Sequence, residues 1–235
     1  MEGFFDFLGQ LEGAGISYGA AGINRMNWRY HHIVEPLKDA LEGATVLDLG
    51  SHDGRWPYAL AAAGATVTGI EGRGDLIAQF SRYPDAEVKK LVTFIEGDFV
   101  AEMDRLLAEG KRFDFVTCLG VFYHTIQHYR ILMQMVAFRP KVIVVDSEFK
   151  LSERAMILVG KDKTGRKNSS IAQQQGQPWV PVGRISRPAL ELMVDSLGYS
   201  VEWNAWDVPE DEREGVADYF DQRGVQRFTC FLRPE

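Results

Sequence analysis

The sequence of 235 residues contains few cysteines, no long apolar run and no extended basic region. Its two cysteines, Cys118 and Cys230, exclude a disulfide framework, and neither lies in a spacing typical of metal ligands. No apolar run approaches the roughly 20 residues that span a bilayer. The first ten residues lack the basic and apolar regions of a signal peptide. We therefore expect a cytoplasmic protein without a membrane partner.

The charge balance is acidic, with 33 acidic and 26 basic side chains and a formal net charge of −7. Proteins that bind nucleic acids usually carry a basic stripe, because neutralised phosphates supply most of their affinity. Basic residues concentrate only at Lys161, Lys163, Arg166 and Lys167, where Asp162 interrupts them. This run is typical of a solvated loop, and the charge disfavours a nucleic-acid partner.

Short apolar segments alternate with segments of helical spacing between residues 27 and 147. The predicted strands are residues 44–50, 65–71, 92–96, 113–120 and 141–147. The predicted helices are residues 27–41, 55–63, 75–83, 99–108 and 123–138. Strands that are apolar on both faces and alternate with helices indicate a parallel sheet covered on both sides.

The pattern changes after residue 150. Residues 151–185 are polar and contain glycines, and we interpret them as a substrate loop or lid, since loops of this length are usually functional. A helix is predicted from Ser186 to Gly198, followed by two strands at 199–207 and 225–233. We expect one domain over residues 1–235, with residues 1–43 as an N-terminal helical cap.

The strongest local signal is the segment DLGSHDG from Asp48 to Gly54, which follows a predicted strand and precedes a predicted helix. Glycines allow the backbone to approach a ligand, and the helix N-terminus offers free N–H groups. The spacing G-x-x-x-G differs from the G-x-G-x-x-G of dinucleotide sites. The preceding acidic residue favours a ligand that carries a cation and an amino group over one that carries phosphates.

Acidic residues also follow the next two strands. Glu71 ends the second strand, where its carboxylate can accept hydrogen bonds from two ribose hydroxyls. Asp98 follows the third strand, where it can accept from an adenine amino group. Because parallel strands end at one edge of the sheet, these residues and Asp48 indicate a nucleoside-binding crevice there.

These positions resemble the signature of the Rossmann-like (class I) S-adenosylmethionine-dependent methyltransferases. In that signature, D/E-x-G-x-G-x-G is followed by acidic residues after the second and third strands, and His52 here replaces the middle glycine. The resemblance implies a doubly wound α/β fold, with a mostly parallel seven-stranded sheet that ends in an antiparallel hairpin. It implies S-adenosylmethionine as the cofactor, bound by Asp48, Gly50, Ser51, His52, Gly54, Glu71, Asp98, Phe99 and Leu119.

The segment LGVFYH, from Leu119 to His124, follows the fourth predicted strand. It is similar to a segment of the tRNA wobble-uridine carboxymethyltransferases and of several sugar O-methyltransferases, among them those acting on methylmannose polysaccharide precursors. A hydroxyl acceptor must lose its proton, either to a general base or with the help of a metal ion. His124 titrates near physiological pH and is the favoured base.

Asp146 and Glu148 lie at the end of the fifth predicted strand, and alternation along the strand places both on the same side. They leave two mechanisms open. In the first, His124 accepts the proton and one carboxylate orients it. In the second, Asp146 and Glu148, together with His124, hold Mg²⁺, which prefers oxygen ligands. We favour the first.

Aromatic and basic residues supply candidates for acceptor binding. They are Trp28, Tyr30, Tyr123, Trp179 and Arg184. His128, one turn after His124, is expected to pack in the core.

We predict methyl transfer to a hydroxyl of a small saccharide. The alternatives are an RNA-modifying methyl- or carboxymethyltransferase of the tRNA wobble-uridine type, and another small-molecule O- or N-methyltransferase. The sequence also allows a homodimer.

Overall fold

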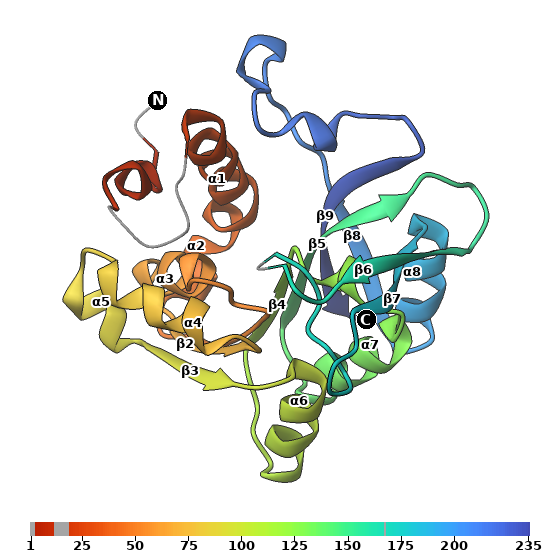
Figure 1. Ribbon diagram of the computed structural model, residues 1–235, viewed down its shortest axis with the longest axis horizontal. Helices are drawn as coiled ribbons and strands as arrows, with labels where there is room; N and C mark the ends of the chain where they lie inside the picture. The colour runs from red at the N-terminus through yellow and green to blue at the C-terminus, as the bar shows by residue number, and fades with distance from the viewer. Residues whose placement is uncertain (1–2, 12–18, 167) are drawn as a thin grey trace.

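A seven-stranded sheet forms the centre of the computed structural model, which describes residues 3–11, 19–166 and 168–235 (Figure 1). Its strand order is β3-β2-β1-β4-β5-β9-β8. The strands from β3 to β5 pair in parallel, whereas β9 runs antiparallel to both β5 and β8. The predicted Rossmann-like sheet with an antiparallel C-terminal hairpin is therefore confirmed.

The strands follow the predicted apolar runs. They are β1 (Thr45–Leu49), β2 (Thr66–Glu71), β3 (Val92–Glu96), β4 (Phe115–Leu119), β5 (Val142–Lys150), β8 (Tyr199–Asn204) and β9 (Val225–Pro234). Successive side chains along a strand point to opposite faces of the sheet. Val46 and Phe115 accordingly lie in one buried cluster, while the next residues, Leu47 and Val116, lie in the cluster on the opposite face.

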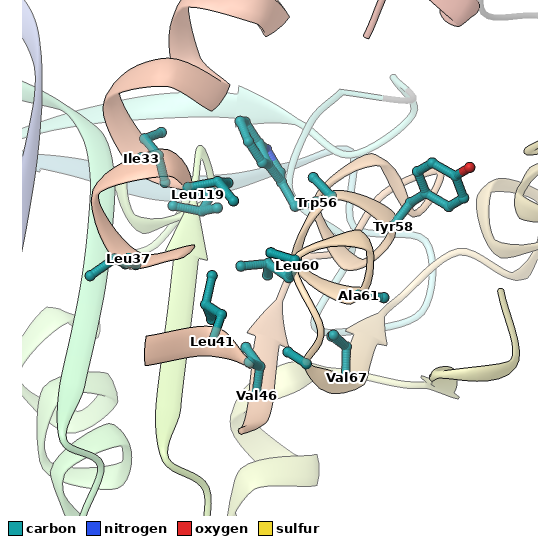
Figure 2. Close-up of a cluster of buried hydrophobic side chains, with 14 of the residues drawn as sticks. Ile33, Leu37, Leu41, Val46, Trp56, Tyr58, Leu60, Ala61, Val67 and Leu119 are labelled. Carbon is teal, nitrogen blue, oxygen red and sulfur yellow. The ribbon is translucent and has the colours of Figure 1, made fainter. Parts of the chain in front are cut away.

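Helices cover both faces of the sheet (Figure 1). One side carries α1 (Ala20–Ile33), α2 (Lys38–Leu41), α3 (Arg55–Ala62), α4 (Gly74–Ile77) and α5 (Ala86–Lys90), and the other carries α6 (Phe99–Ala108), α7 (His128–Ala137) and α8 (Arg187–Asp195). Figure 2 shows the first layer, in which Leu41 of α2, Val46 of β1 and Leu60 of α3 gather in one apolar cluster. Among the described residues, no helix is both long and apolar enough to span a bilayer.

Short 3-10 helices connect several of these elements. They are η1 (Asp6–Gln10), η2 (Glu35–Leu37), η3 (Ala78–Arg82), η4 (Phe122–His124), η5 (Glu210–Glu212) and η6 (Ala217–Tyr219). The predicted helix over residues 75–83 is divided between α4 and η3, and α5 was not predicted.

The predicted helix over residues 27–41 is three elements instead of one. α1 begins earlier, at Ala20, and ends at Ile33, and it is followed by η2 and α2. Pro36 explains the break, because a proline inside a helix lacks a donor and collides with the carbonyl four residues before it. That carbonyl belongs to His32, and it accepts a hydrogen bond from Asn204 Nδ2 at 2.5 Å instead.

The predicted helix over residues 123–138 begins late, at His128. Thr125 is extended, its hydroxyl accepts from the Gln127 N–H, and its carbonyl accepts from the Gly183 N–H. Such local bonds of threonine compete with helix formation. His128 is buried and its Nε2 lies 3.1 Å from the Gly183 carbonyl, which confirms its packing role.

The region interpreted as a loop, residues 151–185, contains an antiparallel pair of strands, β6 (Ile157–Lys163) and β7 (Trp179–Ile185). Ile157 and Val159 of β6 are exposed, so this strand lacks the apolar face by which a buried strand is recognised in a sequence. β5 also extends to Lys150, beyond its predicted end at residue 147, because β9 pairs with it as far as Lys150↔Val225.

Candidate active site

The glycine loop after β1 folds over the end of β2. Both Gly50 and Ser51 donate their N–H groups to the Ile70 carbonyl, at 2.9 and 3.0 Å. Gly50 has a φ of +68°, and Val121 lies within 3.0 Å of where a Cβ would stand, so a side chain at this position would be strained and crowded. His52 has a φ of +54°, which explains why the related signature usually has glycine there.

Glu71 at the end of β2 is the centre of this crevice. One carboxylate oxygen accepts from the His52 N–H at 2.8 Å, and the other accepts from the Arg73 N–H at 3.0 Å. Each oxygen retains a lone pair for a further donor. Since Glu71 lines the cavity, its carboxylate can accept from two ribose hydroxyls, as the sequence predicts.

Asp98 follows β3 and has two functions in the structure. Its Oδ1 caps α6 by accepting from the Val100 and Ala101 N–H groups, at 2.9 and 3.1 Å. The residue also lines the cavity, where its second oxygen can accept from an adenine amino group. Phe99, the first residue of α6, lines the same part of the cavity and offers a ring to a nucleobase.

Asp48 of β1 and Ser51 of the glycine loop are both buried and lie outside the cavity lining, which differs from the direct contacts predicted for them. Thr117 Oγ1 donates to Asp48 Oδ1 at 2.6 Å, whereas Asp48 Oδ2 is buried without a partner among the described residues. Burial raises the pKa of Asp48 to about 7. Gly54 is also outside the lining and packs against Phe80.

The crevice forms part of a cavity of about 620 Å³, a volume typical of small-ligand sites. The cavity brings together the cofactor residues predicted at β1–β4 and the segment that follows β4. The predicted residues that line it are Gly50, His52, Glu71, Asp98, Phe99, Leu119, Tyr123 and His124.

His124 lines the cavity and is oriented by a carboxylate that the sequence did not indicate. Its Nδ1 lies 2.7 Å from Asp162 Oδ2 on β6. Asp162 also accepts from the N–H and hydroxyl of Ser170, and the same hydroxyl lies 2.8 Å from the His124 carbonyl. Burial lowers the pKa of His124, and Asp162 opposes that effect. The imidazole is therefore neutral at pH 7 and held in one orientation, as a general base requires.

Asp146 is fully buried inside the paired region of β5 and away from the cavity, which differs from its predicted catalytic position. Its Oδ1 accepts from Arg29 and Arg227 at 2.8 and 3.0 Å. Its Oδ2 accepts from the hydroxyls of Tyr219 and Thr229 at 2.6 and 2.7 Å. Both oxygens are thus occupied by protein donors, so Asp146 is suited to hold two arginines in place.

Glu148 lies on the same side of β5 as Asp146, since Arg227 contacts both. Its Oε2 accepts from Arg184 Nε at 2.6 Å, so it pairs with an arginine and not with His124. Neither Glu148 nor Arg184 lines the cavity. Over the described residues, no group of three or more His, Cys, Asp or Glu side chains is placed to hold a metal ion, and the donors predicted for Mg²⁺ are separated.

Four predicted acceptor residues lie outside the cavity, namely Arg184 and three aromatic residues. Trp28 stacks on His32 and packs with the cluster of Val208 and Tyr219, and Tyr30 stacks on Phe4 at 4.4 Å between ring centroids. Trp179 is exposed beneath Lys161. Their aromatic character therefore reflects packing or surface contacts in this structure. Tyr123 does line the cavity.

The connection between β6 and β7 covers the cavity, and we call its described residues, 164–166 and 168–173, the lid loop. Arg73 Nη2 donates to the carbonyls of Thr164, Arg166 and Ser170, at 3.0, 2.9 and 3.5 Å. On the other side, His52 Nε2 lies 2.8 Å from Asn168 Oδ1. Because Glu71 binds the backbone of both His52 and Arg73, the predicted ribose ligand lies between the two attachments of the lid loop.

Replacing Arg73 with alanine should weaken binding of S-adenosylhomocysteine by roughly fivefold to thirtyfold, because the lid loop loses about 1–2 kcal/mol of charge-assisted hydrogen bonds. The Arg73 backbone N–H, which holds Glu71, is unchanged by this substitution. Titration calorimetry measures the affinity, and Arg112→Ala is the control, since among the described residues that exposed side chain bonds only the neighbouring Lys111 carbonyl. Equal affinities would show that Arg73 does not hold the lid loop over the ligand.

Four functional residues were missed from the sequence, namely Arg29, Arg73, Asp162 and Arg227. Asp162 was visible only as an acidic residue that interrupts a basic run. The arginines carried no local signal, since each acts on residues far away in the chain. Arg29 and Asp146, for example, are 117 positions apart.

A Rossmann-like sheet with a glycine loop after β1 and a carboxylate at the end of β2 defines a nucleoside-binding enzyme fold. The family described as "Methyltransferase domain" matches residues 25–202, and the chain belongs to this family. Residues 25–202 therefore form a methyltransferase domain.

Solved structures share the fold over nearly the whole chain. The N-terminal domain of EvdMO1 with S-adenosylhomocysteine bound has a TM-score of 0.64 and 18% identity, covering 95% of this chain and 86% of that one. Magnesium protoporphyrin IX methyltransferase from Synechocystis PCC 6803 with bound S-adenosylmethionine has a TM-score of 0.56 and 13% identity, covering 98% and 91%.

Curated relatives carry the name tRNA U34 carboxymethyltransferase. The protein from Alcanivorax borkumensis is 31% identical over 102 residues, which are 43% of this chain and 30% of that protein. The protein from Pseudomonas fluorescens is 26% identical over 180 residues, which are 75% of this chain and 51% of that protein. The chain thus spans about half, or less, of the length of these relatives.

Proposed function

We propose that the protein transfers the methyl group of S-adenosylmethionine to a hydroxyl of a small saccharide. The observation that carries this proposal is the pairing of His124 with Asp162 at the cavity wall. A sulfonium methyl group needs no activation, whereas an alcohol becomes a good nucleophile only as it loses its proton. A buried, neutral and oriented imidazole supplies that step.

Each residue of this pair has a separate task in the proposed reaction. Asp162 accepts from the Nδ1–H of His124, so Nε2 is left unprotonated. Within the described residues Nε2 has no hydrogen-bond partner, and it can accept the proton of an acceptor hydroxyl. When bound, the cofactor would supply the methyl group: a bond would form between the hydroxyl oxygen and the methyl carbon while the C–S bond breaks, and the electron pair of the broken bond would stay on sulfur. The products are a methyl ether, S-adenosylhomocysteine and a protonated His124.

The wall around His124 supports a polyhydroxylated acceptor. It is formed by neutral side chains that can both donate and accept, namely Thr125, Gln127, Asn168, Ser169, Ser170 and Gln173. Sugar hydroxyls also donate and accept, so such a wall matches them better than it matches an apolar or strongly charged acceptor. One similar structure, that of EvdMO1, was determined in the presence of S-adenosylhomocysteine and D-fucose.

A second candidate function is modification of a tRNA wobble uridine, with a methyl or a carboxymethyl group. The names of the curated relatives favour it. Lys161 and Lys163 of β6 and Arg166 of the lid loop are exposed beside the cavity and could contact phosphates. The net charge of −7 and the partial coverage of those relatives count against it.

A panel of acceptors tests the proposal. Purified protein and labelled S-adenosylmethionine would be incubated with monosaccharides, oligosaccharides and tRNA, with and without a chelator. We expect label in a saccharide product, and activity that survives exhaustive chelation. Label in tRNA alone would establish the second candidate, and loss of activity that Mg²⁺ restores would establish the metal mechanism.

A further inference from the structure

A serine of the lid loop contacts both members of the His124–Asp162 pair. The Ser170 N–H donates to Asp162 Oδ2 at 2.9 Å. The Ser170 hydroxyl lies 3.0 Å from the same oxygen and 2.8 Å from the His124 carbonyl, and its single proton can be donated to either. Asp162 Oδ2 is also the atom that lies 2.7 Å from His124 Nδ1. Ser170 therefore lies where the general base meets its carboxylate.

The two members of this pair come from different sheets. Asp162 belongs to β6, which pairs with β7 in a two-stranded sheet, whereas His124 follows β4 of the seven-stranded sheet. The Gly183 N–H of β7 donates to the Thr125 carbonyl at 2.8 Å and joins the small sheet to the segment that follows β4. Because the described strands of the two sheets share no ladder, the groups that contact both His124 and Asp162 decide how these residues are placed. Ser170 is such a group.

The loop that carries Ser170 is also attached to the cofactor crevice. Two residues before it, Asn168 Oδ1 lies 2.8 Å from His52 Nε2 in the glycine loop. Arg73 Nη2 donates to two further carbonyls of the loop at 3.0 and 2.9 Å. The backbone N–H groups of His52 and Arg73 both bind Glu71, the predicted ribose ligand. The lid loop thus connects the predicted ribose site with the general base.

We propose that Ser170 is a positioning residue, through which the closed lid loop holds Asp162 and His124 in the geometry needed for proton transfer. This inference rests on the proposed function, because it takes His124 as the general base. Ser170 keeps the Asp162 carboxylate on the Nδ1 side of the imidazole, so Nε2 is left unprotonated. Closure of the loop over the cofactor crevice thereby completes the base.

Ser170→Ala tests the hydroxyl, since the backbone N–H is kept. We expect kcat at saturating cofactor and acceptor to fall by about threefold to tenfold, the effect of one lost hydrogen bond. Ser170→Thr retains a hydroxyl and should recover most of this loss. Ser81→Ala is the matched control, because that exposed hydroxyl also donates to a backbone carbonyl but lies outside the cavity lining. Its kcat should equal that of the wild type.

The dependence of kcat on pH separates positioning from a general loss of structure. The kcat should fall at low pH as His124 becomes protonated. A hydroxyl that donates to Asp162 stabilises its negative charge, so without it the carboxylate should attract the proton of the imidazolium more strongly. This acidic limb should therefore move to higher pH in Ser170→Ala and return in Ser170→Thr. The other groups that face His124 are unchanged in both variants, namely Glu148, Arg184 and Tyr123.

A double-mutant cycle tests whether the lid loop transmits the effect. Arg73→Ala weakens the attachment of the same loop at the cofactor crevice, so it should also lower kcat at saturating cofactor. If both residues act through the closed loop, Ser170→Ala should have a smaller effect in the Arg73→Ala background than in the wild type. Equal effects in the two backgrounds would overturn the role of the lid loop.

Failure of this inference can be distinguished from failure of the proposed function. If His124→Ala loses the acidic limb while Ser170→Ala keeps the kcat and the limb of the wild type, His124 is the base and Ser170 does not position it. A lower kcat in Ser170→Ala with an unmoved limb would also overturn the proposal, and would give Ser170 a role in acceptor binding or folding. An unchanged kcat in His124→Ala would remove the base itself, and the inference with it.

Discussion

Replacing His124 with alanine should lower kcat by about a hundredfold or more and leave the affinity for S-adenosylhomocysteine nearly unchanged, since general-base catalysis contributes roughly 10²–10⁴-fold. The residue follows β4, whereas Glu71 and Asp98, which are the predicted nucleoside ligands, follow β2 and β3. Single-turnover assays measure the chemical step, and calorimetry measures the affinity. An unchanged kcat would remove the base assignment.

The dependence of kcat on pH tests the protonation state of His124 independently. Burial lowers the pKa of His124 below its usual 6.5, so the neutral form that accepts a proton predominates at pH 7. Activity should therefore fall only as pH decreases below about 6.5. His124→Ala should lack this acidic limb, whereas His128→Ala, which alters a buried histidine outside the cavity, should keep it. The second variant is thus a matched control.

Asp162→Asn separates orientation from proton transfer. Asp162 raises the pKa of His124 against the effect of burial, so its neutralisation should move the acidic limb to lower pH. An asparagine can also donate to Nδ1, which would place the imidazole in the wrong tautomer and lower kcat by about tenfold or more. A merely structural role for Asp162 would reduce the amount of folded protein without moving the pH profile.

The second large effect concerns stability. Asp146→Asn should lower the free energy of unfolding by about 3–5 kcal/mol, because it leaves the buried guanidiniums of Arg29 and Arg227 without a shared carboxylate. Urea denaturation followed by circular dichroism measures this loss. Asp221→Asn is the control, since that carboxylate bonds exposed Arg223 only two residues away and should have little measurable effect.

The contribution of Asp146 to the free energy of unfolding depends on pH, because folding changes the pKa of its carboxyl group. Burial alone would raise the pKa of Asp146, but Arg29 and Arg227 outweigh it and lower the pKa to about 2. The folded-state value therefore lies below the unfolded value of about 3.9. The stabilisation is complete above about pH 4 and is lost as pH falls toward 2. Wild-type stability should thus decline more steeply over this interval than that of Asp146→Asn, and equal slopes would contradict the assignment.

The sequence was informative about the cofactor crevice because its signals are local. Glu71 and Asp98 were predicted from their positions after two apolar strands, and both line the cavity. The reaction edge was harder to predict. Asp146 follows the same rule of position, yet β9 pairs alongside it and Tyr219 and Thr229 occupy one of its oxygens. Asp146, which the sequence places near the end of a strand, therefore lies in the interior of the sheet.

The amino-acid sequence by itself determined the parallel sheet, its coverage by helices and the edge at which a nucleoside binds. Apolar periodicity and turn chemistry are properties of consecutive residues, so they can be read without coordinates. The tertiary structure decided which carboxylate lies beside His124 and which arginines pair with the buried carboxylate of Asp146. The pairings of His124 with Asp162 and of Arg29 with Asp146 join residues 38 and 117 positions apart, and only the packing of β6 and α1 against the sheet brings them within hydrogen-bond distance.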